Sequence, residues 1–475
     1  MKLIGERFNL QDTHGRCRHN PKRGAAAPRL PARRKGENRL NNTMSIVPGT
    51  ASVTLLLAGL LTFSIPCAAA SSERGGPPLP EGRISSIAFG SCAKQWQYQG
   101  IWDAVIEAKP DLWLFLGDAV YADTDGKTAW LVSPQQLAGE WNRLADKPEF
   151  QKARSKIPMM ATWDNHDYGS HAGGKEFPVK EDSKRIFLDF FGEPADSLRR
   201  KTPGIYDAKI FGPEGQRVQI ILLDTRFFKD SYKKDPTPKE ERLKAGKVGG
   251  YVPDDDPAKT LLGQEQWSWL KEQLEQPAQV RLIASSIQII PDEKGMDEWG
   301  NFPHERQRLF DLIENSGADG IILLSGNVHF AELSKSYAGD YPLFELTSSG
   351  MTHVTAPYAK AANEYRIAGP STDLNFGIVE IDWKAGPSPT ITLKAVAADG
   401  STAFDHPVRL GDLKSGEPSG EPETVTCPEP RPQICTQDYR PVCARLADGS
   451  LKTYSNGCTA CTDSTVESYR EGQCE

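Results

Sequence analysis

Apolar segments alternate with polar loops along most of this chain, and their lengths predict strands separated by helices. Six apolar runs of strand length each end in a glycine or a polar cluster, and they cover residues 83–90, 112–116, 157–161, 218–226, 281–290 and 320–330. Helical periodicity is found over residues 100–108, 134–150, 262–274 and 305–314. This order is typical of an α/β fold in which a site gathers beyond the carboxyl ends of the strands.

The pattern changes toward the end of this region. Three later segments alternate between apolar and polar residues, which predicts antiparallel strands closing a second sheet. They are 343–348, 376–382 and 390–396. Residues 411–426 are rich in Gly, Pro, Ser and Glu without apolar periodicity, which predicts a linker. The main domain is therefore expected to span 83–410, followed by a small domain over 427–474.

The beginning of the chain has the pattern of an export signal. Residues 1–43 contain eleven Lys or Arg and three acidic residues, and residues 52–66 form an apolar run that small residues follow. We therefore assign residues 1–70 to a basic segment and a signal peptide cleaved near Ala70. The mature protein is expected to be periplasmic or secreted.

Other interpretations of this beginning stay open. Lipid attachment at Cys67 and a translation start at Met44 are the alternatives, whereas Pro66 shortens the apolar run and argues against a stable membrane span. The chain of 475 residues has a net charge of −7, and the basic segment leaves −15 for the remainder. A nucleic-acid partner is therefore not expected, although metal ions can still supply positive charge for phosphate esters.

Side chains able to bind metal ions or phosphate follow the predicted strands. They are Cys92, Asp118, Tyr121, Asp164, Asn165, His166, Arg226, Asn327 and His329. Alone, each has a plainer explanation: the Asp-Asn-His-Asp run is compatible with a solvated turn, His329 with a core histidine, and Cys92 with an inert core residue. Their joint placement at successive strand ends favours a two-metal hydrolase, in which cations bind a phosphoryl group and activate water.

Seven short motifs surround these residues. They are FGSC at 89–92, FLGDAVYADT at 115–124, ATWDNHDYG at 161–169, LLDTRFF at 222–228, SSIQ at 285–288, NFPHER at 301–306 and SGNVHFAEL at 325–333. Together they resemble the PhoD (alkaline phosphatase D) branch of the calcineurin-like metallophosphoesterases. The resemblance implies a four-layer α/β/β/α sandwich that hydrolyses phosphomonoesters or phosphodiesters, and we expect a metal-bound hydroxide as the nucleophile.

The resemblance also implies metal ligands. Cys92, Asp118 and Tyr121 are expected to bind an iron-like ion, with Asn165 and His329 completing the metal shell. A thiolate and a phenolate favour a trivalent ion such as Fe³⁺, whereas oxygen ligands suit Ca²⁺, with Zn²⁺ or Mn²⁺ as alternatives.

His166, Arg226 and Asp164 are the expected catalytic residues. Arg226 would bind phosphate, and His166 would either donate a proton to the leaving group or only orient Asp164 or Asn165. Asn165 and Asn327 stand where this branch usually has Asp, and a neutral amide at Asn327 binds a cation less strongly. The alternative function is therefore a weakened phosphatase-like protein that acts mainly as a secreted binding or protease-inhibitor protein.

The nine cysteines also separate the tail from the main domain, where Cys92 is alone. Six cysteines within residues 427–474 permit fifteen pairings, and disulfides are favoured over a zinc site because this tail has no His and export is expected. Motifs at 439–443 and 453–458 resemble a Kazal domain, a small α+β fold. The resemblance implies the pairs Cys427–Cys461, Cys435–Cys458 and Cys443–Cys474. It also implies a protease-binding loop at 436–440, with Gln437 entering the specificity pocket of a serine protease.

Overall fold

The computed structural model describes a main domain and a small C-terminal unit. The described residues are 76–123, 132–171, 173–386, 388–414, 424–428, 430–432, 435, 441–471 and 474. The predicted signal segment 1–70 and the predicted protease-contacting Gln437 lie outside them. No helix in this part of the chain is long and apolar enough to cross a membrane.

The first sheet of the main domain has six strands in the order β15-β14-β13-β1-β2-β3. Their bounds are β1 (Ser86–Gly90), β2 (Leu112–Leu116), β3 (Met159–Thr162), β13 (Asn375–Asp382), β14 (Thr390–Ala397) and β15 (Thr402–Arg409). Strands β1, β2 and β3 are parallel to one another. The expectation that segments 376–382 and 390–396 close a second sheet is wrong, because β13 pairs antiparallel with β1 and β14 with β13.

The second sheet has seven strands in the order β12-β10-β11-β9-β8-β5-β4. Their bounds are β4 (Asp207–Phe211), β5 (Val218–Leu222), β8 (Val280–Ala284), β9 (Ile321–Ser325), β10 (Ala331–Ala338), β11 (Tyr341–Ser348) and β12 (Arg366–Ser371). The central strands β5, β8, β9 and β11 are parallel, and antiparallel strands lie at both edges. Strands β6 (Lys233–Lys234) and β7 (Tyr251–Val252) form a separate pair.

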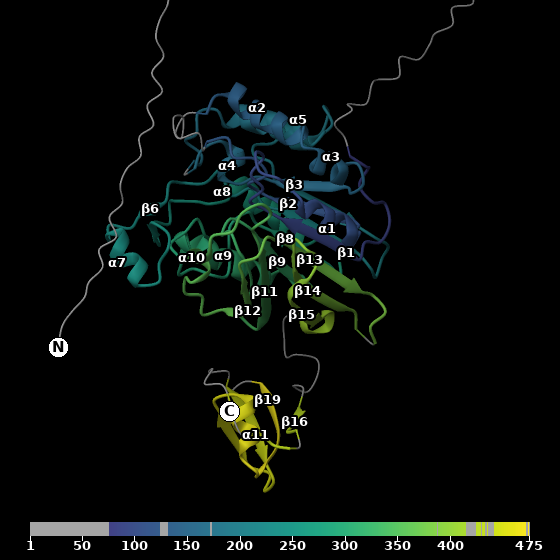
Figure 1. Cartoon of the computed structure of the whole chain (residues 1–475), viewed down its shortest axis with the longest axis vertical. Coiled ribbons are helices and arrows are strands. Elements are labelled where there is room, and N and C mark those ends of the chain that lie inside the picture. Colours follow the sequence, from purple (N-terminus) through teal and green to yellow (C-terminus); the bar gives the residue numbers. More distant parts are fainter. Residues whose placement is uncertain are drawn as a thin grey trace, which may run out of the picture. The chain divides into compact units, whose positions relative to one another are not determined.

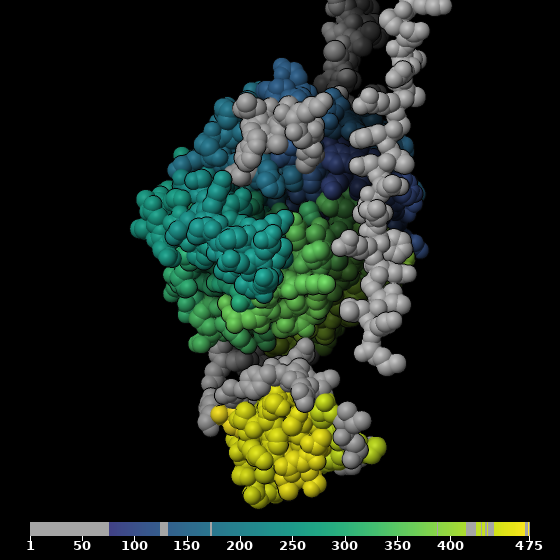
Figure 2. All heavy atoms as spheres, turned by 60° about the vertical axis from the view of Figure 1, so that its left-hand side comes forward, coloured from purple at the N-terminus to yellow at the C-terminus, as the bar shows by residue number. Residues whose placement is uncertain are grey.

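Helices cover the outer faces of the two sheets (Figure 1). The α-helices of the main domain are α1 (Ile101–Ala108), α2 (Pro134–Ala145), α3 (Pro148–Arg154), α4 (Asn165–Tyr168), α5 (Lys180–Phe190), α6 (Leu198–Lys201), α7 (Lys239–Lys244), α8 (Gly263–Leu274), α9 (Pro303–Asn315) and α10 (Ala356–Ala359). The predicted helix 134–150 is two helices, since Pro148 occupies the first turn of α3. In the space-filling view, teal residues from the middle of the chain gather on one face beside the green residues of later strands (Figure 2).

Alternating side chains of β2 define the layers. Leu112, Leu114 and Leu116 face the second sheet and belong to a hydrophobic cluster that continues through that sheet to α8 and α9 on its other face. Trp113 and Phe115 point the other way, into a second core with α1, α2, α3 and α5. Because successive strand residues face opposite sides, this division confirms the predicted four-layer α/β/β/α sandwich.

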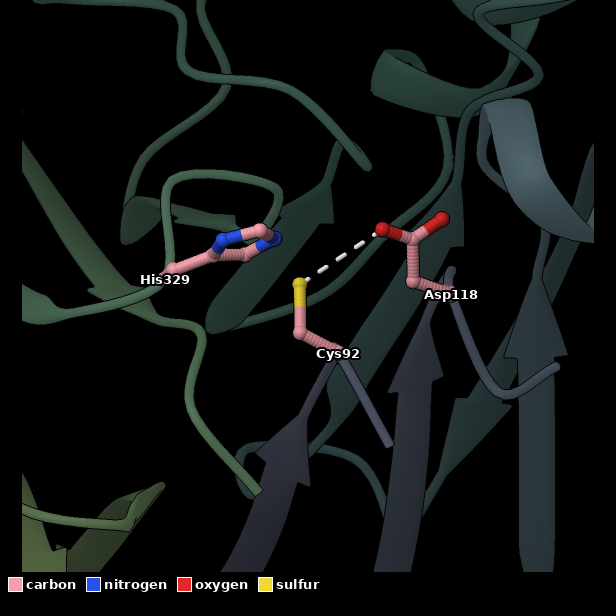
Figure 3. Close-up of side chains that lie close together, drawn as sticks. All are labelled: Cys92, Asp118 and His329. Carbon is pink, nitrogen blue, oxygen red and sulfur yellow. Dashed lines mark hydrogen bonds between the residues drawn. The ribbon is translucent and has the colours of Figure 1, made fainter. Parts of the chain in front are cut away.

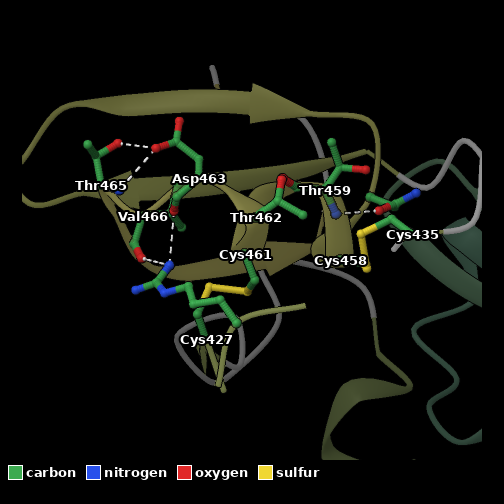
Figure 4. Close-up of a disulfide and its surroundings, with 11 residues drawn as sticks. Cys427, Cys435, Cys458, Thr459, Cys461, Thr462, Asp463, Thr465 and Val466 are labelled. Carbon is green, nitrogen blue, oxygen red and sulfur yellow. Dashed lines mark hydrogen bonds between the residues drawn. A yellow bond between two sulfur atoms is a disulfide. The ribbon is translucent and has the colours of Figure 1, made fainter. Parts of the chain in front are cut away.

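The C-terminal unit is a small sheet with one helix. Its elements are β16 (Val425–Thr426), β17 (Val442–Leu446), β18 (Leu451–Tyr454), α11 (Gly457–Thr462) and β19 (Val466–Glu471). Three disulfides join Cys427 to Cys461, Cys435 to Cys458 and Cys443 to Cys474. Figure 4 shows the surroundings of the first two. This is the pairing that the Kazal resemblance implies. A unit with so few buried apolar residues depends on such covalent links for stability.

Candidate metal centre

Loops at the carboxyl ends of the parallel strands converge on one place. Cys92 follows β1, Asp118 follows β2, and His329 follows β9 of the other sheet. Their ligand atoms lie within 4.8 Å of one another, and Cys92 Sγ is 3.5 Å from Asp118 Oδ2. Figure 3 shows the three side chains pointing toward one another from separate loops. A thiol, a carboxylate and an imidazole thus meet where the two sheets adjoin.

The backbone at these positions adopts an unusual conformation. Cys92, Asp118, Asn327 and His329 have φ values of 63°, 53°, 70° and 61°. Residues other than glycine enter this left-handed region at a cost of about 1–2 kcal/mol each. Four such residues around one cluster indicate that the fold maintains strain there to direct side chains inward.

Residues after β11 hold Cys92 and His329 in place. The Ser349 hydroxyl lies 3.0 Å from Cys92 Sγ and accepts a hydrogen bond from the backbone N–H of His329 at 2.9 Å. Thr355 Oγ1 is 3.0 Å from His329 Nδ1, so Nε2 is the nitrogen available to a cation. Tyr121 adjoins the cluster, and its hydroxyl lies 3.4 Å from Nε2 of His353.

Asp167 organises the loop that carries Asp118. Its carboxylate accepts hydrogen bonds from the backbone N–H groups of Asp118, Val120 at 2.9 Å and Asp164 at 3.0 Å. Burial raises the pKa of Asp167 to about 7. The Asp-Asn-His-Asp run is therefore not a solvated turn, because Asp164, Asn165 and Asp167 are all buried.

The acids of the cluster fit a bound cation. Burial raises the pKa of Cys92 and raises the pKa of Asp118 and Tyr121 well above their ordinary values. In addition, Asp164 Oδ2 and Asn165 Oδ1 are buried without a hydrogen-bond partner in the described part of the chain. Buried oxygens that lack donors are costly unless a cation accepts their lone pairs. The donor set therefore fits a bound cation.

Arg226 is an anchor for Asp164. The guanidinium is fully buried, its Nε donates to Asp164 Oδ1 at 2.7 Å, and its Nη2 donates to Asp297 Oδ2 at 2.9 Å. Ser286 Oγ donates to the same Asp164 oxygen at 2.9 Å. Only Nη1 has no hydrogen-bond partner among the residues described here, and the role of Arg226 in phosphate binding stays a prediction.

His166 pairs with Asp123. Its Nδ1 lies 2.5 Å from Asp123 Oδ1, and its backbone N–H donates to Asp118 Oδ1 at 3.3 Å. Burial lowers the pKa of His166, but the charges of Asp118 and Asp123 outweigh burial and raise the pKa overall. The imidazole is thus oriented by Asp123 through Nδ1, and the role of His166 as a proton donor or as an orienting residue stays a prediction.

Comparisons with known proteins agree with this geometry. The family model of PhoD-like phosphatases matches residues 87–384, which is more than half of the chain. The chain belongs to the PhoD-like phosphatase family. Alkaline phosphatase D of Bacillus subtilis (strain 168) is 23% identical over 308 residues, covering 57% of this chain and 50% of that protein. This PhoD-like chain therefore spans about half the length of that curated relative.

A solved structure also has the PhoD fold. The structure described as "Structure of PhoD" matches with a TM-score of 0.52 at 17% sequence identity, covering 72% of this chain and 74% of that one. At this identity the match supports the fold alone, and it agrees with the four-layer architecture.

Several residues of this PhoD-like site were not singled out from the sequence. They are Asp123, Asp167, Asp297, Ser349 and His353. Ser349 and His353 follow β11, so the rule of polar residues after a strand would have found them. Asn327 was predicted as a ligand, and its Nδ2 donates to the backbone oxygen of Asp297 at 3.0 Å.

Proposed function

We propose that this PhoD-like protein is an exported, metal-dependent phosphoesterase that hydrolyses phosphate monoesters or diesters. The observation that carries the proposal is the convergence of the buried Cys92 and Asp118 and the half-buried His329 from two sheets on one place. Export is supported by the three disulfides, which form and persist in oxidising compartments.

The residues divide into two sets of donors. Cys92, Asp118 and Tyr121 would hold a trivalent ion such as Fe³⁺, and oxygen donors such as Asn165 and Asn327 would hold Ca²⁺, with Zn²⁺ or Mn²⁺ as alternatives. His329 would contribute its Nε2. Bound cations at such a site polarise a phosphoryl oxygen and lower the pKa of water.

Two side chains, His166 and Arg226, have roles beside the metal ligands: His166 in proton transfer and Arg226 in positioning Asp164. The charges of Asp118 and Asp123 outweigh burial and raise the pKa of His166, and with Nδ1 committed to Asp123, Nε2 would deliver a proton to the leaving oxygen. Arg226 fixes the position of Asp164 through Oδ1, so that Asp164 Oδ2 stays directed away from the guanidinium. Ser349 and Thr355 keep Cys92 and His329 oriented.

Hydrolysis of p-nitrophenyl phosphate and bis-p-nitrophenyl phosphate tests this proposal. The full chain is stripped with a chelator and reloaded separately with Fe, Ca, Mn and Zn, alone and in pairs. We expect the chelated protein to be inactive and at least one metal or pair to restore release of p-nitrophenol from one substrate. The ratio of the two rates assigns the ester class. No turnover under any loading contradicts the proposal.

A further inference from the structure

A second group of metal-binding side chains lies next to the candidate centre. Asp123, His166 and His171 offer one carboxylate oxygen and two imidazole nitrogens within 4.8 Å of one another. None of the three belongs to the ligand set proposed above. Asp123 comes from the loop after β2, His166 from α4, and His171 from the segment after α4.

The carboxylate of this group is buried and incompletely paired. Asp123 is 3% exposed, and its Oδ1 lies 2.5 Å from His166 Nδ1. Its Oδ2 is buried and has no hydrogen-bond partner among the described residues. A buried carboxylate oxygen without a donor normally requires a water molecule or a cation.

His171 completes the group from the solvent side. The Asn165 Nδ2 lies 3.1 Å from His171 Nδ1 and also donates to the His171 backbone oxygen at 3.1 Å, which fixes the imidazole near the other two side chains. His171 is exposed, so a cation can reach the group from solvent. Two imidazoles and one carboxylate, with no sulfur, form a donor set that suits Zn²⁺ and similar borderline cations.

We propose that Asp123, His166 and His171 form an additional, inhibitory site for a borderline divalent cation such as Zn²⁺, distinct from the centre around Cys92. A cation bound there takes both His166 Nδ1 and the Asp123 carboxylate as ligands. The hydrogen bond between them is lost, and its proton is released to solvent. The inhibition rests on the proposed phosphoesterase function, because a cation on Nδ1 takes His166 out of its hydrogen bond to Asp123 and so changes the position from which Nε2 would deliver its proton. The binding of the cation does not depend on that function.

Co²⁺ is a suitable probe for this site, because its spectrum distinguishes the two donor sets. Co²⁺ bound to Cys92 gives a sulfur-to-metal charge-transfer band, whereas Co²⁺ bound to imidazole and carboxylate gives only ligand-field bands. The full chain is titrated as parent, His171→Ala and His406→Ala. His406 lies on β15, where its ring packs on Phe344 at 5.5 Å, so its variant removes an imidazole without touching the group.

The inference predicts a saturable ligand-field signal without a matching sulfur band in the parent and in His406→Ala. In His171→Ala the affinity for the Co²⁺ that gives this ligand-field signal falls at least about tenfold, since a direct ligand is lost. Equal affinity and stoichiometry in His171→Ala and the parent overturn the inference.

The inhibitory role is tested by measuring the rate of p-nitrophenyl phosphate hydrolysis as a function of Zn²⁺ concentration. His171 is outside the proposed catalytic residues, so His171→Ala retains basal activity while the Zn²⁺ concentration for half inhibition rises at least about tenfold. An unchanged inhibition curve contradicts an inhibitory role. If the parent does not hydrolyse the ester at all, the proposed function fails, and the Co²⁺ titration still decides whether the site exists.

Discussion

The two sheets contribute chemically different walls to the candidate centre. The wall from the first sheet, formed by the loops after β1, β2 and β3, carries the acids Cys92, Asp118, Tyr121 and Asp164. The wall from the second sheet, formed by the loops after β5, β9 and β11, carries Arg226, Asn327, His329 and His353. One wall is therefore acidic, and the other supplies neutral donors and a guanidinium.

Burial shifts the pKa values of the side chains on the two walls in opposite directions. It raises the pKa of Cys92, Asp118 and Tyr121, and it lowers the pKa of His329 to about 4 and of His353 to about 3. Both shifts have one cause, because a low-dielectric environment disfavours whichever form is charged. A cation between the walls would lower the raised pKa values of the acidic side chains. The neutral imidazoles on the other wall would then be free to donate a lone pair to the cation. A bound cation would therefore make the acidic wall and the neutral wall complementary.

The largest effect is expected when the acidic wall loses the charge at its centre. Asp118→Asn keeps the side-chain size but replaces a carboxylate by an amide, so kcat/KM should fall on the order of 10²- to 10³-fold. Hydrolysis of p-nitrophenyl phosphate and metal content by elemental analysis measure the effect. Asp103→Asn, which alters an exposed carboxylate paired with Lys152, is the matched control and should behave as the parent. Equal activity in both variants would show that the acidic wall is not the reactive site.

A second prediction concerns the ion pair between Arg226 of one wall and Asp164 of the other. Arg226→Met leaves the buried Asp164 without its guanidinium, and the free energy of unfolding should fall by about 3–5 kcal/mol. Urea denaturation measures it. Arg185→Met removes an exposed pair with Asp182 and should cost less than about 1 kcal/mol. Similar losses in the two variants would contradict the anchoring role of Arg226.

The neutral wall can be tested through pH in the metal-free protein. The pKa of His353 is lowered to about 3, below the ordinary value of about 6.5. As the pH falls below about 6.5, the unfolded state binds a proton at His353 before the folded state does. The free energy of unfolding therefore decreases as the pH falls toward 3. His353→Gln should reduce the drop in unfolding free energy between pH 7 and pH 4 by about 2 kcal/mol, allowing for partial exposure. His406→Gln is the control, and an identical drop in His353→Gln and the parent would argue against this account.

The smallest effect is expected from adding a charge to the neutral wall. Asn327→Asp supplies a carboxylate ligand but loses the hydrogen bond to the Asp297 backbone oxygen and places two oxygens together. The two effects oppose each other, so metal affinity should rise by less than about tenfold, corresponding to less than about 1.4 kcal/mol. Competition with a chelator measures it, with Asn315→Asp on α9 as the control. Weaker binding in Asn327→Asp would show that Asn327 is not a ligand.

The sequence predicted the parts of this arrangement that depend on local pattern. Buried parallel strands are continuous apolar runs, so their ends, and with them Cys92, Asp118 and His329, could be located. Strand β4 was missed because its residues are mostly half-buried and at a sheet edge, where the apolar pattern is weak. The domain limits 83–410 and 427–474 stay predictions.

Long-range contacts and backbone conformation could not be predicted in this way. Ser349 lies beside Cys92 across 257 residues of sequence, and no local signal marks that contact. The positive φ of Asp118 is likewise a property of the folded loop. The position of Arg226 after a buried strand was compatible with contact to phosphate, and only the fold reveals the carboxylates of Asp164 and Asp297 around it.

The central claim is that one cation joins the two walls through the sulfur of Cys92 and the imidazole of His329. X-ray absorption at the edge of the bound metal in the reloaded full chain tests this claim directly. We predict a sulfur contribution that is lost in Cys92→Ser and an imidazole contribution that decreases in His329→Gln. A spectrum with only oxygen and nitrogen neighbours, unchanged in both variants, would contradict it.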